Sequence, residues 1–130
     1  MTPRERFFLG LATEEKFGYC RAIKADGRVW VSGTTALQDS GGVLPAHRGD
    51  AYAQSTEAFR RIGQALAQFG LVMENIVAVR AYLTTAECMA GFLRAHAEVL
   101  RNVKPASTMV GTPFLFHPDL LVEIEAEAVA

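Results

Sequence analysis

The chain has little of what marks several classes of protein. Its 130 residues include two cysteines, Cys20 and Cys88, which form neither a disulfide framework nor a metal-ligand spacing. No apolar run reaches the ~20 residues of a membrane-spanning helix, and the N-terminal segment is too charged for a signal peptide. Thirteen Lys and Arg balance fourteen Asp and Glu, so the basic excess of nucleic-acid-binding proteins is missing. These absences predict a cytoplasmic protein without metal, cofactor, membrane or nucleic-acid partner.

The composition is that of an ordinary globular domain. Half of the residues are apolar and 21% are charged, which argues against disorder. A chain of this length corresponds to one domain and can bury a core without disulfides or metal. We therefore expect a single domain over residues 1–130.

Hydrophobic periodicity predicts five strands and two helices. The strands are expected at residues 19–25, 28–33, 76–84, 106–111 and 120–129. Asp26-Gly27 is a strong turn signal for a hairpin between the first two strands. One helix is expected from the cap residue Asp50 to Gly70, and a second from the cap residue Thr85 to the turn before Pro105. The order β-β-α-β-α-β-β predicts a two-layer α+β fold, with both helices on one face of the sheet.

The face of this sheet away from the helices is predicted to be unusual. Side chains alternate along a strand, so one face of each strand should join the core. These core positions are Val29, Val31, Val77, Val79, Ala81, Leu83, Val122, Ile124, Ala126 and Ala128. The opposite face should then carry Trp30, Ser32, Arg80, Tyr82, Glu123 and Glu125. It is too aromatic for plain solvent and too charged for a core, and it suits a subunit interface that contains a polar cleft.

Four charged or polar side chains are candidates for chemistry. Glu123 and Glu125 lie two residues apart on one strand, so their carboxylates are roughly 7 Å apart and each raises the pKa of the other. Such a carboxylate can activate water, but it can equally form a salt bridge or face solvent. Arg80 lies within an apolar strand and must pair with Glu123 or Glu125 or bind an anion. His96, on the apolar stripe of the second helix, is predicted to be a packed, hydrogen-bonded histidine.

Several short motifs resemble the RidA/YjgF family, also called the endoribonuclease L-PSP or YjgF-like family. In chain order they are Gly18-Tyr19, Val31-Ser32-Gly33, Asn75-Ile76-Val77, Lys104-Pro105-Ala106 and Val122-Glu123-Ile124-Glu125-Ala126. Each is weak alone, but together they extend from about residue 17 to residue 129 at the family's spacing. The resemblance implies a chorismate-mutase-like fold and a homotrimer whose ligand clefts lie between subunits.

The resemblance also implies an activity and a set of site residues. Family members typically hydrolyse reactive imines or enamines, such as 2-aminoacrylate, to a 2-keto acid and ammonia. Carried over, the catalytic glutamate is Glu123, and Tyr19 and Ser32 line the substrate pocket. The deaminases have an arginine after the Pro-Ala pair that binds the substrate carboxylate, whereas this chain has Ser107 there. Arg80 could replace the missing cation.

The sequence leaves three functions open. The first is an imine or enamine hydrolase of a divergent subgroup, with Arg80 and Ser107 among its substrate-binding residues. The second is a non-catalytic, small-molecule-binding or regulatory homotrimer that keeps the cleft. The third is the ribonuclease role in the family's older name, which the near-neutral charge disfavours.

Overall fold

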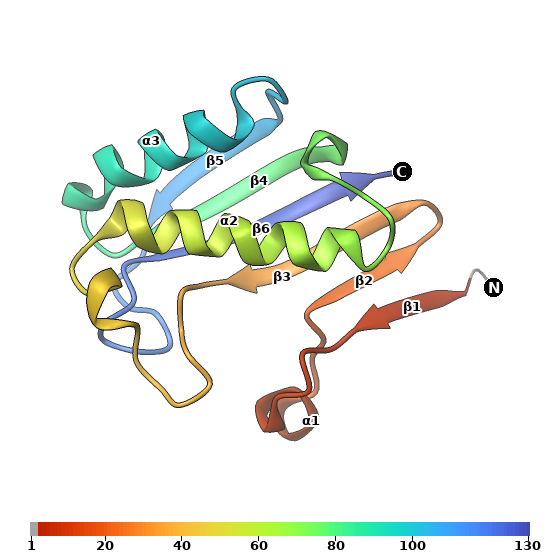
Figure 1. Cartoon of the computed structure of the whole chain (residues 1–130), viewed down its shortest axis with the longest axis horizontal. Helices are drawn as coiled ribbons and strands as arrows, with labels where there is room; N and C mark the ends of the chain where they lie inside the picture. Colours follow the sequence, from red (N-terminus) through yellow and green to blue (C-terminus); the bar gives the residue numbers. More distant parts are fainter. Residues whose placement is uncertain (1–2) are drawn as a thin grey trace.

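The computed structural model describes residues 3–130 as one six-stranded sheet with helices (Figure 1). The strands are β1 (Arg4–Phe7), β2 (Ala22–Ala25), β3 (Arg28–Thr34), β4 (Ile76–Leu83), β5 (Ala106–Gly111) and β6 (Val122–Val129). The α-helices are α1 (Ala12–Phe17), α2 (Ala51–Ala67) and α3 (Met89–Leu100), and three short 3-10 turns, Pro45–His47, Met73–Asn75 and Ala86–Cys88, complete the elements. The strand order across the sheet is β1-β2-β3-β6-β4-β5.

The strand pairing makes a mixed sheet. β4 and β5 are parallel, because α3 carries the chain back between them, and every other neighbouring pair is antiparallel. The β2–β3 hairpin turns at Asp26 and Gly27, whose φ angles of 56° and 74° are those that a two-residue hairpin turn needs. This turn was predicted from the sequence and is confirmed.

Helices α2 and α3 cover one face of the sheet and enclose the core (Figure 1). Phe59, Ile62 and Leu66 recur at helical spacing on α2 and are buried, as are Phe92 and Leu100 on α3. The predicted cap at the start of α2 is present, since the Asp50 side chain accepts a hydrogen bond from the backbone N–H of Ala53 at 2.9 Å. Within residues 3–130, no helix is long and apolar enough to cross a membrane.

Two N-terminal elements extend the predicted fold. β1 was not predicted, because its sequence Arg-Glu-Arg-Phe is largely exposed at the sheet edge and shows no apolar alternation. α1 has six residues, too few to display a helical stripe. The second main helix starts later than expected, because Thr85 precedes a 3-10 turn and α3 begins at Met89.

The uncovered face carries the predicted side chains, with one correction. Trp30 is 36% exposed and Tyr82 is partly buried, as expected for the face away from the helices. Val77 was predicted to be a core residue, but it is 46% exposed. The register of β4 against β6 shifts between Ile76 and Ala78, so Ile76 takes the core position and Val77 points outward. A bulge of one residue is not visible in the alternation of the sequence.

Glycines at two helix positions give a matched test of the packing between α2 and α3. A Cβ on Gly91 would lie 2.7 Å from the backbone nitrogen of Tyr52, whereas one on Gly63 would meet only the Met73 sulfur at 3.6 Å. We expect Gly91→Ala to lower the free energy of unfolding by about 1–3 kcal/mol through overpacking. Gly63→Ala should raise it by about 0.5–1 kcal/mol, because alanine favours a helix. Thermal denaturation at one protein concentration compares them, and shifts of the same sign would contradict the close approach at Gly91.

Candidate functional site

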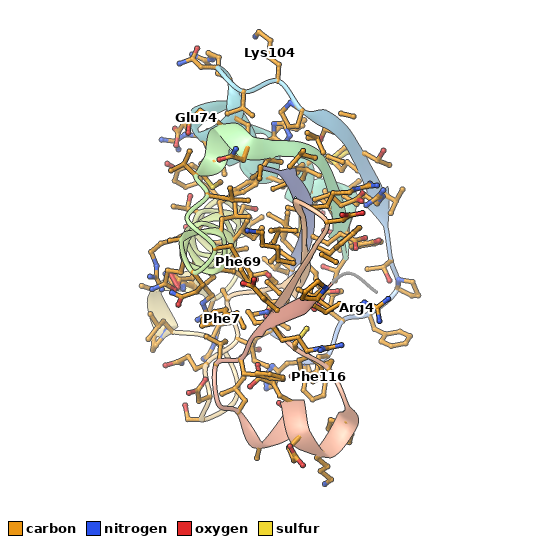
Figure 2. The ribbon with its side chains drawn as sticks, turned by 90° about the vertical axis from the view of Figure 1, so that its right-hand side faces the viewer. Arg4, Phe7, Phe69, Glu74, Lys104 and Phe116 are labelled. Atoms are coloured by element: carbon orange, nitrogen blue, oxygen red, sulfur yellow. The ribbon has the colours of Figure 1, made fainter. Side chains whose placement is uncertain are left out.

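The main cleft lies between the N-terminal segment around α1 and the adjoining part of the sheet. It has a volume of about 830 Å³, and its walls come from residues before and within α1, from β3 and its following loop, from α2 and from β6. Phe7 and Phe116, both in the cleft wall, lie in the half of the molecule that contains α1 (Figure 2). The buried Glu14 carboxylate accepts the backbone N–H groups of Leu9, Gly10 and Leu11 at 2.8–3.0 Å. It thereby holds one wall in place.

Three of the five predicted site residues meet in this cleft. Tyr19, Ser32 and Glu123 all line it, although they come from distant parts of the chain. The Ser32 hydroxyl donates to the carbonyl of Cys20 at 2.7 Å, which ties β3 to the segment that follows Tyr19. The Tyr19 hydroxyl lies 2.9 Å from that of Thr13, so α1 and Tyr19 are also joined. The predicted grouping of these three residues in space agrees with the structure, while their roles remain predictions.

Gly33 makes room for the Glu123 carboxylate. A Cβ at residue 33 would lie 2.7 Å from Oε2 of Glu123, closer than real contacts allow. The register between β3 and β6 shifts between Val31 and Thr34, so the backbone at Gly33 leaves the regular ladder at this point. A glycine at a bulge therefore lets a carboxylate rest against the sheet backbone instead of pointing into solvent.

The surroundings of Glu123 favour its protonated form. Burial raises the pKa of Glu123, and the nearby Glu125 raises it further, while Arg21 opposes both effects. Glu125 itself accepts a short hydrogen bond from the Tyr82 hydroxyl. The predicted effect of Glu125 on Glu123 is thus present, but burial is the larger cause. A half-buried carboxyl whose pKa is raised is a candidate for taking up and returning a proton.

A second, smaller hollow adjoins the first. It measures about 380 Å³ and lies between the uncovered sheet face and the loop after β5. Gly33, Phe116 and Glu123 line both hollows, so Glu123 stands where they meet. Tyr82 and Glu125 face only the second one. The Glu123 carboxyl can therefore be approached from two sides.

Arg80 and Ser107 lie outside both hollows. Arg80 was expected to pair with Glu123 or Glu125 or to bind a ligand, but its Nη2 contacts Glu127 Oε2 at 3.0 Å. Although Glu125 is directly opposite Arg80 in the register, the long side chain reaches one pair further along the strand. The expectation of an ion pair is right and the partner is wrong.

Ser107 lies on the exposed edge strand β5 and contacts a histidine. Its hydroxyl is 2.9 Å from Nε2 of His96. The His96 ring packs edge-on against Phe59 and Phe92, and burial lowers its pKa. The prediction of a packed, hydrogen-bonded His96 is confirmed. Within a single chain, neither residue is in a position to contact a ligand bound beside Glu123.

Two arginines in the cleft were missed by the sequence reasoning. Arg21 and Arg61 both line it. Arg21 lies in the strand predicted over residues 19–25, which contains both polar and apolar residues. Nothing in its sequence distinguished Arg21 from a charged side chain that faces solvent. The only available signal was its position two residues after Tyr19, which places both side chains on the same side of an extended segment. Among residues 3–130, no group of three His, Cys, Asp or Glu side chains is arranged to hold a metal ion.

The chain is similar in sequence to one protein family and to several of its members. Residues 11–130 match the sequence profile of the family described as Endoribonuclease L-PSP. An uncharacterised Streptomyces coelicolor protein, SCO2049, is 35% identical over 119 residues, which are 92% of this chain and 87% of that protein. The 3-aminoacrylate deaminase RutC of Acinetobacter baylyi is 30% identical over 110 residues, covering 85% of each chain.

Solved structures share the whole architecture. Rv2704 from Mycobacterium tuberculosis, described as a member of the YjgF/YER057c/UK114 family, superposes with a TM-score of 0.87. It is 34% identical, and the match covers 98% of this chain and 100% of that one. Yeast Mmf1 superposes with a TM-score of 0.83 at 25% identity, over 98% of this chain and 98% of that one. The α+β fold predicted from the sequence is the fold of these proteins.

Proposed function

Because the chain belongs to the RidA/YjgF family, whose sequence profile is that of Endoribonuclease L-PSP, we propose that it hydrolyses reactive imines or enamines to a carbonyl compound and ammonia. The observation that carries the proposal is the Glu123 carboxyl, which lies half-buried at the junction of two hollows with its pKa raised by burial. The deaminase name of the Acinetobacter relative supports the same reaction class.

The chemistry needs one group that can accept and return a proton. Water adds to the imine carbon while Glu123 accepts its proton, and the C=N electron pair moves to nitrogen, which takes that proton from Glu123. The carbinolamine hydroxyl then gives its proton to Glu123 and on to nitrogen as the C–N bond breaks, so imine and water become carbonyl compound and ammonia. An enamine first tautomerises to the imine, gaining a proton on carbon and losing one from nitrogen. Tyr19 and Ser32 would line the substrate's path to Glu123.

The proposal places the reaction in clefts between the subunits of a cytoplasmic homotrimer. Supporting this arrangement, the uncovered sheet face presents Trp30 and Tyr82 beside charged groups, a mixture that suits burial against another copy. Ser107 and Arg80 would then act only across a subunit boundary. Sedimentation in dilute buffer tests the trimer, and a stable monomer would contradict the shared clefts.

An ammonia-release assay tests the activity. We expect the purified protein to accelerate ammonia release from freshly generated 2-aminoacrylate or from another member of a panel of small and aryl-substituted imines. Release from the same panel without protein gives the background rate. If every imine decays at its background rate, the proposed hydrolase activity is wrong.

One observation favours a second candidate, a non-catalytic small-molecule-binding homotrimer. Ser107 stands where the resembling deaminases have their carboxylate-binding arginine, and a serine cannot make a bidentate, charged contact. Saturable binding of small carboxylates or ketones without turnover would support this candidate over the hydrolase.

A further inference from the structure

We propose that the main cleft takes an organic anion with a bulky apolar body and that Arg21 is the residue that binds its charged group. The inference rests on the proposed function in one respect, since it treats this cleft as the ligand site. It goes further by naming the anchor and the class of ligand. It also assigns to Arg21 the part that sequence reasoning gave to Arg80.

Arg21 has donors to spare beside Glu123. Its Nη2 donates to the carbonyl of Gly33 at 2.7 Å, which is the only hydrogen bond of its side chain to residues 3–130. Its Nε is buried and has no hydrogen-bond partner in that part of the chain. A buried guanidinium N–H without an acceptor is uncommon in folded proteins and calls for a partner. The fork of a guanidinium suits a carboxylate, which can accept two parallel hydrogen bonds.

Glu123 does not neutralise Arg21. No salt bridge within 4.0 Å joins the two side chains in residues 3–130, although each influences the pKa of the other. Arg21 is partly buried, and this burial lowers its pKa because its charge is only partly solvated. A half-buried cation near a proton-exchanging carboxyl can therefore hold an anion close to Glu123.

Arg61, the other arginine of the cleft, is already occupied. Its Nη1 donates to the carbonyls of Thr35 and Leu37, both at 2.7 Å, and its Nε contacts Glu57 at 3.0 Å. These bonds attach the loop after β3 to α2. Arg61 thus builds the wall of the cleft, whereas Arg21 lines the cleft with donors that no group in residues 3–130 accepts.

The apolar part of the wall sets the second requirement on the ligand. Phe7, Leu9, Leu11, Phe17, Leu37 and Phe116 line the same cleft as Arg21. Leu9, Phe17 and Phe116 are 50%, 61% and 73% exposed, so they offer a large apolar surface that a ligand can cover. A volume of about 830 Å³ exceeds what a three-carbon acid can fill. The cleft suits a carboxylate that carries an aromatic or branched apolar group.

Calorimetric titration with three probes tests both requirements on the full-length protein. The probes are 3-phenylpropanoate, its uncharged analogue 4-phenylbutan-2-one, and propanoate, which lacks the ring. Wild type should bind 3-phenylpropanoate tightest and propanoate about 10-fold or more weakly, because a buried phenyl group is worth at least that factor. Arg21→Gln should weaken 3-phenylpropanoate about 30-fold or more and leave the ketone unchanged.

Further variants make the result decisive. Arg94→Gln, on the exposed surface of α3, removes the same charge far from the cleft and should bind the acid like wild type. If Arg21→Gln fails to fold, Arg21→Lys replaces it in the titration. The NMR resonance of the Arg21 Nε–H group in wild type gives a second measurement, and it should shift with 3-phenylpropanoate but not with the ketone. The inference is overturned if wild type binds the acid and the ketone equally well, or if it binds neither. It is also overturned if Arg21→Gln binds the acid like wild type, or if Arg80→Met loses binding instead.

The same data separate this inference from the proposed function. If the protein hydrolyses imines but Arg21→Gln binds anions as wild type does, the proposed hydrolase function stands and the role of Arg21 is wrong. If anions bind through Arg21 but no ammonia is released, the role of Arg21 stands and the proposed hydrolase function is wrong.

Discussion

Replacing Glu123 with glutamine should lower the turnover of imine hydrolysis by about 10²–10⁴-fold, the usual contribution of a general acid or base. The substitution keeps the size of the side chain but removes the group that accepts the water proton. Ammonia release under saturating imine measures the effect. A Glu123→Gln protein that turns over at the wild-type rate would exclude this carboxyl from the reaction.

Glu127→Gln is the matched control for this experiment. Glu127 lies on the same strand and the same face, but it pairs with Arg80 at 3.0 Å and lies outside both hollows. We expect its turnover to stay within a few-fold of wild type. An equal loss in both variants would point to a general effect of charge on the sheet face.

The raised pKa of Glu123 has opposite consequences for activity and stability. As a base it must be ionised, so the acidic limb of the turnover profile should lie at higher pH than for an ordinary glutamate. The folded state holds this proton more tightly than the unfolded state, so the favourable contribution to folding is complete at acid pH and disappears as the pH rises through the folded pKa. At neutral pH, Glu123→Gln should therefore be at least as stable as wild type, and chemical denaturation at several pH values checks the sign.

Gly33→Ala should lower the same turnover by about 10²-fold, the scale expected when a reacting group moves by an ångström. The added methyl would lie 2.7 Å from Oε2 of Glu123 and 2.8 Å from its Cδ, so the carboxylate must move away from the sheet. Because the atoms that must move are the flexible end of a side chain, we expect a much smaller effect on stability than on activity.

Two comparisons isolate this effect. Gly111→Ala makes the same change on β5, where the nearest atom would be the Leu83 carbonyl oxygen at an ordinary 3.8 Å, and it should leave turnover near that of wild type. In a Glu123→Gln background, Gly33→Ala should cost little more activity, because both changes disable one group. Additive losses would show that Gly33 acts by some route other than the Glu123 carboxylate.

The predictable parts of the site were those that depend on alternation along one strand. Alternation placed Trp30, Ser32, Tyr82, Glu123 and Glu125 on the uncovered face, and the structure agrees. The same reasoning failed at Val77, because a shift of register reverses the faces beyond it. It also named the wrong partner for Arg80, since a long side chain can reach either of two neighbouring pairs.

The sequence by itself determined the layers of this protein and its family resemblance. Helical spacing and strand alternation are set by residues close together in the chain, so they can be recognised before any contact is known. Only the tertiary structure decided that Arg21 stands in the cleft with Glu123 and that Gly33 leaves room for the carboxylate. These relations join segments about 90 to 100 positions apart, and they depend on a bulge and on packing that no local pattern records.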